Sequence, residues 1–386
     1  MGKSVVALQM AFLPFLLPPV RQFLDSLADR GYAVTLVKAY PRNRRRTEEL
    51  RPKLNNTMIE LRLRKLPKRS FVAPLVFLEF VLRSIPAALR AKPDVVISFD
   101  VDTLLQGYLV SRLRGAKLIY YSIELYTERP GFKPKALWVW LERLLINKAD
   151  LVVACEPNRA RVMKDKYWAH KLPMTVLNVP PYQEPTRTNR AQEVLAEHGL
   201  PGRKVALYVG ELNRARCIDE FIEAAKYFNE NIVLLLIGPV GHGYDPQAKI
   251  AEAGVQDRVI VHPPVQPQEV MAFTCSADLG LQTQKDDGLN HYYCAPIKLF
   301  QYLMAGLPVL SSNFPGMMEV VEGNDVGLCV NPEDPRAIAG AINQILGDEA
   351  VHNRMARNAL RVAREKYCYE LEGAPLLDAV DTLANP

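Results

Sequence analysis

The sequence predicts an α/β protein with two doubly wound, parallel-sheet domains. Three observations support this fold class. The chain has 386 residues, too many for one ordinary domain. Short apolar runs alternate with amphipathic segments along most of its length, as in parallel sheets covered by helices on both faces. The alternation stops at "PPYQEPTRTNR", residues 180–190, whose Pro-rich polar composition is typical of a linker, and then starts again.

The first predicted domain covers residues 1–182. Its opening run, "MGKSVVALQMAFLPFLLPPV", is interrupted by Gln9 and by three prolines, and no small-residue cleavage site follows. We therefore interpret it as a buried strand and a loop rather than a signal peptide. The predicted strands of this domain are 5–10, 33–40, 94–100, 117–124, 151–156 and 174–179, and the clearest predicted helices are 20–30, 103–113 and 135–148.

The second predicted domain covers residues 183–365, and a helical segment, 366–386, is expected to cross back to the first domain. The predicted strands are 204–210, 232–238, 258–265, 279–284 and 308–312, with helices at 218–228 and 267–276 and helical structure from residue 337 onward. Ligands of doubly wound sheets bind outside the carboxyl ends of the strands. We therefore expect both domains to face one central cleft.

Composition excludes several classes of protein. Hydrophobic residues make up 49% of the chain and charged residues 23%, as in folded globular proteins. Six cysteines are scattered without any CxxC pair, which argues against a zinc ribbon or a disulfide scaffold and favours a reducing, cytoplasmic location. No run of about 18 uncharged apolar residues occurs, so no membrane span is expected.

Positive charge is concentrated near the N-terminus. Residues 41–70 hold 11 Lys and Arg against 3 Glu, a net +8, whereas the whole chain carries +6. The apolar segment "FVAPLVFLEFVLRSIPAALRAK" follows directly. Residues 41–90 could thus make a peripheral contact with an anionic membrane, or they could be a solvated basic loop and an ordinary core helix. No nucleic-acid-binding motif accompanies the charge, and no nucleic acid partner is expected.

One strand–loop–helix segment has the features of a diphosphate site. In "YVGELNRARCIDEFIEAAKYF", Gly210 ends a strand, Arg214 and Arg216 follow, and a helix begins. A glycine lets the backbone approach a ligand, and a helix N-terminus with a guanidinium attracts an anion without a metal. The alternative is a surface arginine pair. Gly238 ends the next strand, but a dinucleotide fingerprint is missing, which disfavours a nicotinamide dehydrogenase.

A second basic site is predicted in "APIKLFQYLMAGLPVLSS". Pro296 precedes an apolar helical run, which places Lys298 on the first turn and Gln301 one turn further. A lysine at this place adds a full charge to the helix N-terminus.

These segments resemble the donor domain of family 4 glycosyltransferases, which are retaining enzymes of the GT-B fold. The matching pieces are "YVGELNRARCIDEFIEA", "LLLIGP", "DRVIVHPPVQPQEV", "ADLGLQTQ", "APIKLFQYLMAGLPVLSS" and "GLCVNPEDPRAIAGAI". The first half is similar less sharply, through "KPDVVISFD", "KLIYYSIELYTE", "ADLVVACE" and "TVLNVP". The resemblance covers most of the chain and is most specific from Tyr208 to Pro335.

The resemblance implies transfer of a sugar from a nucleotide-diphosphate sugar, of UDP or GDP type, to a glycan or lipid-linked acceptor. Surface polysaccharide or glycolipid biosynthesis is the expected role, with no cofactor and no metal. Arg216 and Lys298 would stabilise the departing diphosphate. The donor-binding residues it implies are Gly210, Arg214, Arg216, Gly238, Asn290, Tyr293, Pro296, Lys298 and Gln301. His291, beside Asn290, is a further candidate for lining the donor cleft.

The sequence departs from the family pattern at several positions. Tyr293 and Gln301 stand where many members have two glutamates, the second of which holds the ribose hydroxyls. Cys217 occupies a position that is commonly glycine, and Ile123 one that is commonly histidine. Gln301 can hydrogen-bond a hydroxyl without charge assistance.

Three carboxylates of the first domain are acceptor-side candidates: Asp100 and Asp102 in "FDVD", and Glu124 in "SIELYTE". The Asp-x-Asp spacing is similar to a metal-binding motif of another glycosyltransferase fold, but an aspartate at a strand end is also common. Glu124, included among the catalytic candidates, could polarise an acceptor hydroxyl or cap a structural element.

Two other functions are compatible with these observations. One is a nucleotide-sugar 2-epimerase, which shares the architecture but needs acid and base groups around the sugar. The other is a non-catalytic, sugar-nucleotide-binding subunit of a glycan-assembly complex. The two missing glutamates favour this last interpretation, and the presence of Arg216 and Lys298 opposes it.

Overall fold

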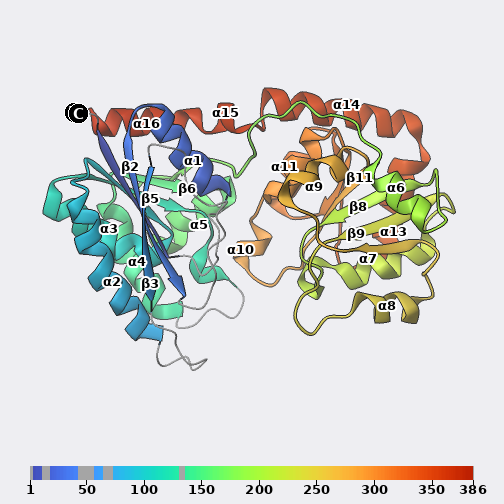
Figure 1. The fold of residues 1–386 in the computed structure, drawn as a ribbon, viewed down its shortest axis with the longest axis horizontal. Coiled ribbons are helices and arrows are strands. Elements are labelled where there is room, and N and C mark those ends of the chain that lie inside the picture. Colours follow the sequence, from blue (N-terminus) through green and yellow to red (C-terminus); the bar gives the residue numbers. More distant parts are fainter. Residues whose placement is uncertain (1–2, 11–17, 42–55, 64–72, 130–134, 386) are drawn as a thin grey trace. The chain divides into compact units, whose positions relative to one another are not determined.

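The computed structural model describes residues 3–10, 18–41, 56–63, 73–129 and 135–385 (Figure 1). The chain forms two compact units. The N-terminal unit contains residues 1–177 and 373–386, and the C-terminal unit contains residues 178–372. The C-terminal end of the chain is thus part of the N-terminal unit.

The N-terminal unit is built on a parallel sheet of seven described strands in the order β3-β2-β1-β4-β5-β6-β7. The order reverses beside β1, which makes the sheet doubly wound as expected. The strands are β1 (Ser4–Met10), β2 (Ala33–Pro41), β3 (Asn56–Leu63), β4 (Val95–Phe99), β5 (Lys117–Ser122), β6 (Leu151–Ala154) and β7 (Met174–Thr175).

Helices cover this sheet, and the last helix of the chain is one of them. They are α1 (Pro18–Asp29), α2 (Ala73–Arg90), α3 (Val101–Arg114), α4 (Lys135–Leu145), α5 (Pro157–Tyr167) and α16 (Ala374–Ala384), with 3-10 turns η3 (Tyr126–Glu128) and η4 (Ile146–Lys148). Leu376 and Val380 of α16 are buried in the same core as Phe23 of α1. The Tyr32 hydroxyl also donates to Asp381 at 2.6 Å.

The C-terminal unit has a parallel sheet of six strands in the order β10-β9-β8-β11-β12-β13, so it follows the same doubly wound scheme. The strands are β8 (Lys204–Val209), β9 (Ile232–Ile237), β10 (Val259–His262), β11 (Leu279–Gln282), β12 (Val309–Ser312) and β13 (Gly327–Val330). The reversal lies between β8 and β11.

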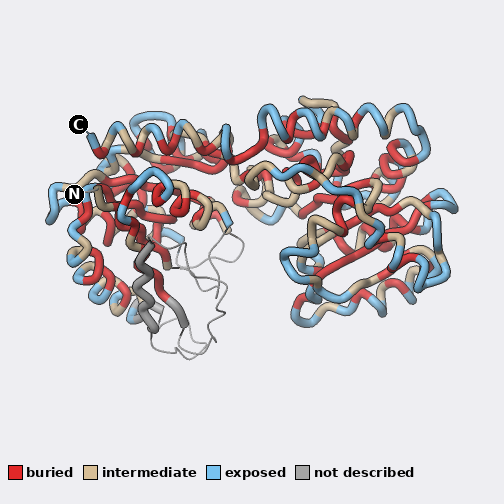
Figure 2. Tube along the Cα trace, turned by 45° about the horizontal axis from the view of Figure 1, so that its top comes forward, coloured by how far each residue is buried: buried red, intermediate tan, exposed pale blue. Residues whose placement is uncertain are grey.

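Most described helices of this unit are short, and α13 and α14 are the longest. They are α6 (Arg190–Glu197), α7 (Ile218–Ala224), α8 (Pro246–Ala253), α9 (Pro267–Thr274), α10 (Leu289–Tyr292), α11 (Ile297–Met304), α12 (Pro315–Val321), α13 (Pro335–Gly347), α14 (Glu349–Glu365) and α15 (Tyr369–Glu372), with 3-10 turns η5 (Arg214–Arg216) and η6 (Ala225–Tyr227). Buried stretches line both sheets, while solvent-exposed segments lie mainly on the helices and loops (Figure 2).

The strands expected from the sequence are present, and residues 180–190 are without helix or strand except at Arg190, where α6 begins. Two strands were missed. β3 lies within the basic segment 41–70, for which no strand was predicted, and β13 precedes the C-terminal helices. Both strands lie at the edge of their sheet. An edge strand pairs with only one neighbouring strand and is less buried, so its sequence need not contain a long apolar run. β7 is also much shorter than expected.

Two expectations from composition can be compared with the structure. All six cysteines are free thiols, so no disulfide scaffold exists. None of the helices in the described part of the chain is long and apolar enough to cross a bilayer.

A glycine of β11 makes room for the anchor of α11. The Tyr302 ring of α11 lies where a Cβ on Gly280 would stand, 2.4 Å from the ring atom Cγ. The Tyr302 hydroxyl accepts from the Val209 amide at 3.2 Å and donates toward the Leu281 carbonyl at 3.2 Å. This buried tyrosine therefore ties α11 to both β8 and β11.

Gly280→Ala should destabilise the C-terminal unit by about 1–3 kcal/mol, because the added methyl overpacks against Tyr302. Gly340→Ala is the matched control, since Gly340 lies in α13 with nothing within 4 Å of the place where its methyl group would stand. That change should raise stability by up to about 1 kcal/mol through helix propensity. Chemical denaturation of both variants measures the difference, and equal effects would contradict the packing argument.

Candidate functional site

The carboxyl ends of β8 and β9 approach each other through two glycines. Gly210 and Gly238 have φ values of 147° and 148°, which side-chain-bearing residues rarely adopt. A Cβ on Gly238 would lie 2.0 Å from the Gly210 carbonyl oxygen, and one on Gly210 would lie 2.6 Å from Nζ of Lys298. Glycine is therefore required at both positions, and the backbone at Gly210 lies directly beside the Lys298 ammonium group.

Lys298 lies on the first turn of α11, two residues after the Ncap residue Pro296. Its ammonium group stands 3.9 Å from the centroid of the Tyr208 ring, a cation–π contact. Burial, together with the neighbouring Arg216 guanidinium, lowers the pKa of Lys298 well below its ordinary value. The cluster therefore holds two cationic groups that gain stability when an anion binds.

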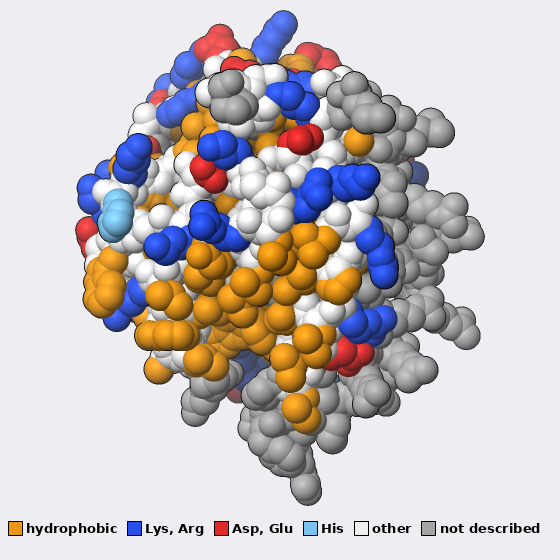
Figure 3. Space-filling model, turned by 90° about the vertical axis from the view of Figure 1, so that its left-hand side faces the viewer, with side chains coloured by type: hydrophobic (Ala, Val, Ile, Leu, Met, Phe, Trp, Pro, Cys, Tyr) orange, Lys and Arg blue, Asp and Glu red, His pale blue; other side chains and the backbone are white. Residues whose placement is uncertain are grey.

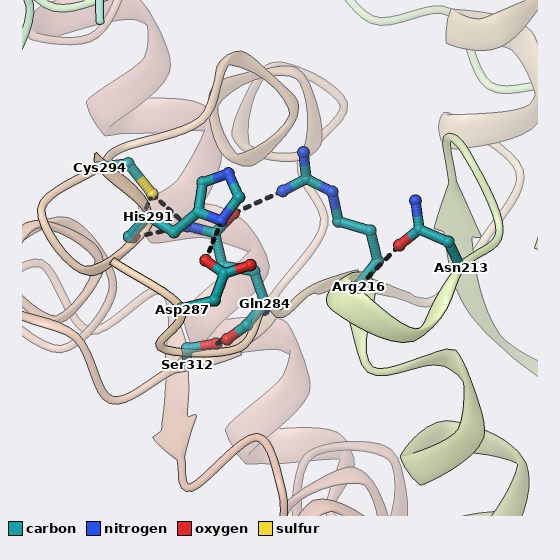
Figure 4. Close-up of polar contacts among 7 residues, drawn as sticks. All are labelled: Asn213, Arg216, Gln284, Asp287, His291, Cys294 and Ser312. Atoms are coloured by element: carbon teal, nitrogen blue, oxygen red, sulfur yellow. Dashed lines mark hydrogen bonds and ion pairs between the residues drawn. The ribbon is translucent and has the colours of Figure 1, made fainter. Parts of the chain in front are cut away.

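Arg216 is the second cation of this cluster. It ends η5, where the Asn213 side chain accepts from the Arg216 amide at 3.1 Å. Its guanidinium donates to Oε1 of Gln284 at 2.5 Å (Figure 4). Asn213 caps the start of the turn, and Gln284, just after β11, accepts from the side chain at its end. These two contacts hold the guanidinium of Arg216 in one place.

Gln284 is a residue that the sequence analysis did not single out. Its side chain is buried, and its amide nitrogen donates to the His291 carbonyl at 2.6 Å while its backbone amide donates to Oγ of Ser312 at 3.0 Å (Figure 4). It therefore joins Arg216 to the loop between β11 and α11. The only signal in the sequence was a polar residue just after a buried strand.

The loop that leads to α11 is braced by its own polar and aromatic contacts. Nδ1 of His291 lies 2.5 Å from Oδ1 of Asp287. The rings of Tyr292 and Tyr293 pack edge to face, with centroids 5.0 Å apart. These contacts support the turn that presents Pro296 and Lys298.

The remaining predicted donor residues are placed differently. Arg214 is largely exposed and pairs with Asp219 at 3.4 Å, so it points toward α7 rather than completing the Lys298–Arg216 pair. Asn290 is buried within α10, and Gln301 is half-buried on α11, one turn beyond Lys298. Their roles as donor contacts stay predictions.

Cys217 has a left-handed backbone, with φ of 58°, at the position where the resemblance to family 4 glycosyltransferases led us to expect glycine. This conformation explains why glycine suits the position. Burial is the main cause that raises the pKa of the Cys217 thiol to about 12, and the nearby Glu220 carboxylate adds to the shift. The raised pKa favours the protonated form of the thiol, which is the less nucleophilic one.

In the N-terminal unit, Asp100 follows β4 with a left-handed φ of 60°. Its Oδ1 accepts from the amides of Ile123 and Glu124, at 2.9 and 3.2 Å, just after β5. Burial raises the pKa of Asp100 to about 6, although the Arg129 guanidinium opposes this shift. The strained aspartate thus locks two strand ends together.

Asp102 lies on the first turn of α3 and is buried, and its Oδ2 has no hydrogen-bond partner. Burial and the neighbouring Asp100 charge raise the pKa of Asp102 well above its usual value. Glu124 accepts from Nε of Arg129 at 2.5 Å, and the Arg129 guanidinium stacks 4.3 Å from the Tyr126 ring centroid. The three predicted acceptor-side carboxylates therefore belong to one cluster.

The described residues include no group of three or more His, Cys, Asp or Glu side chains that could hold a metal ion. Two kinds of site remain, one in each unit. The C-terminal unit presents paired cations at strand ends suited to a diphosphate, and the N-terminal unit presents carboxyl groups suited to hydroxyl groups.

Comparison with known proteins agrees with this arrangement of fold and charge. Residues 19–178 match the model of the glycosyl transferase 4-like domain, and residues 191–362 match that of glycosyl transferases group 1. The two doubly wound parallel sheets match solved structures of the GT-B fold. The chain belongs to the group 1, family 4 type of glycosyltransferases, and it is a transferase enzyme.

Several relatives illustrate how far the similarity reaches. Alpha-D-kanosaminyltransferase of Streptomyces kanamyceticus is 22% identical over 286 residues, which cover 70% of this chain and 71% of that protein. D-inositol 3-phosphate glycosyltransferase of Acidothermus cellulolyticus is 28% identical over 242 residues, 56% and 51% of the two chains. The structure of Anabaena HepE in complex with UDP and glucose is similar with a TM-score of 0.76 at 14% identity, over 99% of this chain and 100% of that one.

Asp100→Asn should change the unfolding free energy relative to the wild type, and this change should favour the variant more at neutral pH than at pH 4. The pKa of Asp100 is raised from 3.8 to about 6 in the folded state, so the folded chain binds more protons between these values. Stability therefore falls as pH rises through that window, by about 3 kcal/mol at most for two pKa units. Asparagine keeps the amide-accepting oxygen without the charge.

Unfolding free energies of the wild type and Asp100→Asn, measured from pH 4 to 7, test this. The difference should move in favour of the variant as pH rises and level off above pH 6. A difference independent of pH would show that Asp100 ionises normally in the folded protein.

Proposed function

We propose that this enzyme is a retaining, metal-independent glycosyltransferase that uses a nucleotide-diphosphate sugar of UDP or GDP type. The observation that carries the proposal is the half-buried Lys298–Arg216 pair beside the end of β8, where Gly210 lets the backbone lie close to the Lys298 ammonium group. Two neighbouring basic groups, Lys298 and Arg216, favour an anion with two negative charges. A nucleoside diphosphate has this charge.

In the proposed reaction the bond between the anomeric carbon and the diphosphate oxygen breaks as the sugar becomes oxocarbenium-like. Negative charge then gathers on the leaving diphosphate. Lys298 and Arg216 neutralise that charge, and the N-terminus of α11 adds its partial positive charge. No metal ion is needed when two fixed cations take this role, although removing one of them is expected to cost about 10²–10³ in rate.

The acceptor is proposed to be a glycan or a lipid-linked glycan that binds to the N-terminal unit. Oδ2 of Asp102, buried without a partner, can accept a hydrogen bond from an acceptor hydroxyl. Glu124 is held by Arg129 and is better suited to orienting the acceptor than to removing its proton. Asp100 supports the backbone beneath both groups.

The ribose of the donor is proposed to bind near Gln301, which can hydrogen-bond hydroxyl groups without charge. The complex of HepE with UDP and glucose supports a nucleotide-sugar site in a protein of this fold. A role in surface polysaccharide or glycolipid biosynthesis, at the cytoplasmic face of the membrane, completes the proposal.

Thermal unfolding in the presence of UDP, GDP, ADP and CMP tests the donor site, each with EDTA and again with Mn²⁺. Ligand at 100 times its Kd should stabilise the folded state by about 2.7 kcal/mol. Lys298→Met and Arg216→Ala should lose this stabilisation. Lys298→Met should keep or exceed the wild-type stability without ligand, because it removes a buried charge while keeping the side chain's bulk.

Arg214→Ala is the matched control, since Arg214 is exposed and pairs with Asp219. Stabilisation by one diphosphate in EDTA, kept in Arg214→Ala and lost in the other two variants, would support the proposal. Stabilisation that requires Mn²⁺, or that survives both substitutions, would contradict the metal-independent cation site.

Binding of the diphosphate should also be coupled to proton uptake by Lys298. Its pKa is depressed in the free protein by burial and by Arg216, and a bound anion restores the charged form. Affinity should therefore fall as pH rises above the pKa of Lys298 in the free protein. Calorimetry over a series of pH values from 7 to 10, where the phosphates are already ionised, in buffers of different ionisation enthalpy should detect up to one proton taken up at the alkaline end of the series. Binding enthalpies that do not depend on the buffer at any of these pH values would contradict proton uptake by Lys298.

A further inference from the structure

Two helices of the N-terminal unit expose rows of large apolar side chains. On α2 these are Leu75, Leu78 and Leu82, and on α4 they are Leu137, Trp140 and Leu144. Each of the six is between 50 and 64% exposed. Both rows have the spacing i, i+3, i+7, which places their members on one side of a helix.

The two rows lie on neighbouring helices. The rings of Phe77 on α2 and Trp138 on α4 pack edge to face, with centroids 4.9 Å apart. The opposite side of α2 is buried through Phe80 and Ala88, so the helix is amphipathic with a second, outward apolar stripe. Figure 3 shows hydrophobic side chains gathered over a broad area of this unit.

Basic side chains outnumber acidic ones on the exposed surface of α2, α3 and α4, although Lys135 pairs with Glu128 at 2.7 Å. Exposed basic side chains of α2, α3 and α4 are Arg83, Arg90, Arg112, Arg114 and Lys135. Among the acidic residues of the same helices, Asp102 and Glu142 are buried, and Glu79 pairs with Arg83 at 2.8 Å. Lys and Arg side chains border the hydrophobic area in Figure 3. We call this surface the α2–α4 face.

We propose that the α2–α4 face docks onto an anionic lipid bilayer. Exposed leucines and a tryptophan would insert shallowly at the level of the headgroups, and the surrounding cations would contact lipid phosphates. A second copy of this chain fits less well, because a symmetric contact would bring the two cationic borders together.

This inference refines the proposed membrane contact and rests in part on the proposed lipid-linked acceptor. From the sequence, a membrane contact through residues 41–90 was one of two alternatives, the other being a solvated basic loop followed by a core helix. Residues 42–55 and 64–72 of that segment lie outside the described residues. The structure adds α4, which lies more than forty residues later in the chain, and it shows which side of α2 is outward.

Co-sedimentation of the full chain with vesicles tests the proposal without any nucleotide. Vesicles of phosphatidylcholine alone are compared with vesicles containing phosphatidylglycerol. We expect binding to the anionic vesicles, weakened by added salt, and little binding to the neutral ones. Absence of binding to both would overturn the proposal.

Variants of exposed residues locate the contact. Leu78→Ser with Leu82→Ser, and separately Trp140→Ser, should weaken binding to the anionic vesicles about tenfold or more, because each removes inserted apolar surface. Leu371→Ser is the control for the leucines, since Leu371 is 50% exposed in the C-terminal unit. Arg112→Gln with Arg114→Gln should also weaken binding, compared with Arg357→Gln and Arg361→Gln on α14.

Vesicle binding unchanged by the α2–α4 variants, or reduced equally by the controls, would overturn the assignment of this face. A change in oligomeric state in the α2–α4 variants, with no change in vesicle binding, would instead identify a second copy as its occupant. Nucleoside diphosphate stabilisation measured on the same variants should be unaffected, so failure of the membrane proposal and failure of the donor site are distinguishable.

Discussion

The cationic pair of Lys298 and Arg216 is the constraint on which the C-terminal unit's site depends. Two like charges close together and partly removed from water are unfavourable, and the low pKa of Lys298 expresses that cost. They stay together because their supports are rigid. Tyr302 anchors α11 to two strands, and Gln284 holds the Arg216 guanidinium. An anion that relieves the repulsion is therefore bound by a site that is already formed.

The N-terminal unit repeats the sheet order but reverses the sign of the charge. Its strand-end site, after β4 and β5, is built from buried carboxyl groups, and Asp100 takes a strained backbone conformation where the other unit uses glycines. Burial favours the neutral forms of Asp100 and Asp102. One architecture thus supports two chemistries, because strand order sets where ligands approach and the side chains at the strand ends set what binds.

The outward rows of apolar side chains on α2 and α4 show that one helix can pack against the core on one side and expose an apolar surface on the other. Leu75, Leu78 and Leu82 do not stabilise the folded unit by burial, since all three are largely exposed. Exposed apolar area of this extent carries a solubility cost unless something covers it. The basic surroundings favour a partner with negative charge.

The sequence by itself determined the fold class, most strands and the position of Lys298 on the first turn of a helix, because these follow from local periodicity and turn residues. It could not determine which polar side chains meet. Gln284 reaches Arg216 from 68 residues away, Arg214 pairs with Asp219 instead, and Asp102 is left with an unpartnered oxygen. The sequence also did not predict the edge strand β3 or the contact between α2 and α4. Contacts of this kind depend on how distant segments pack, and only the tertiary structure decides that packing.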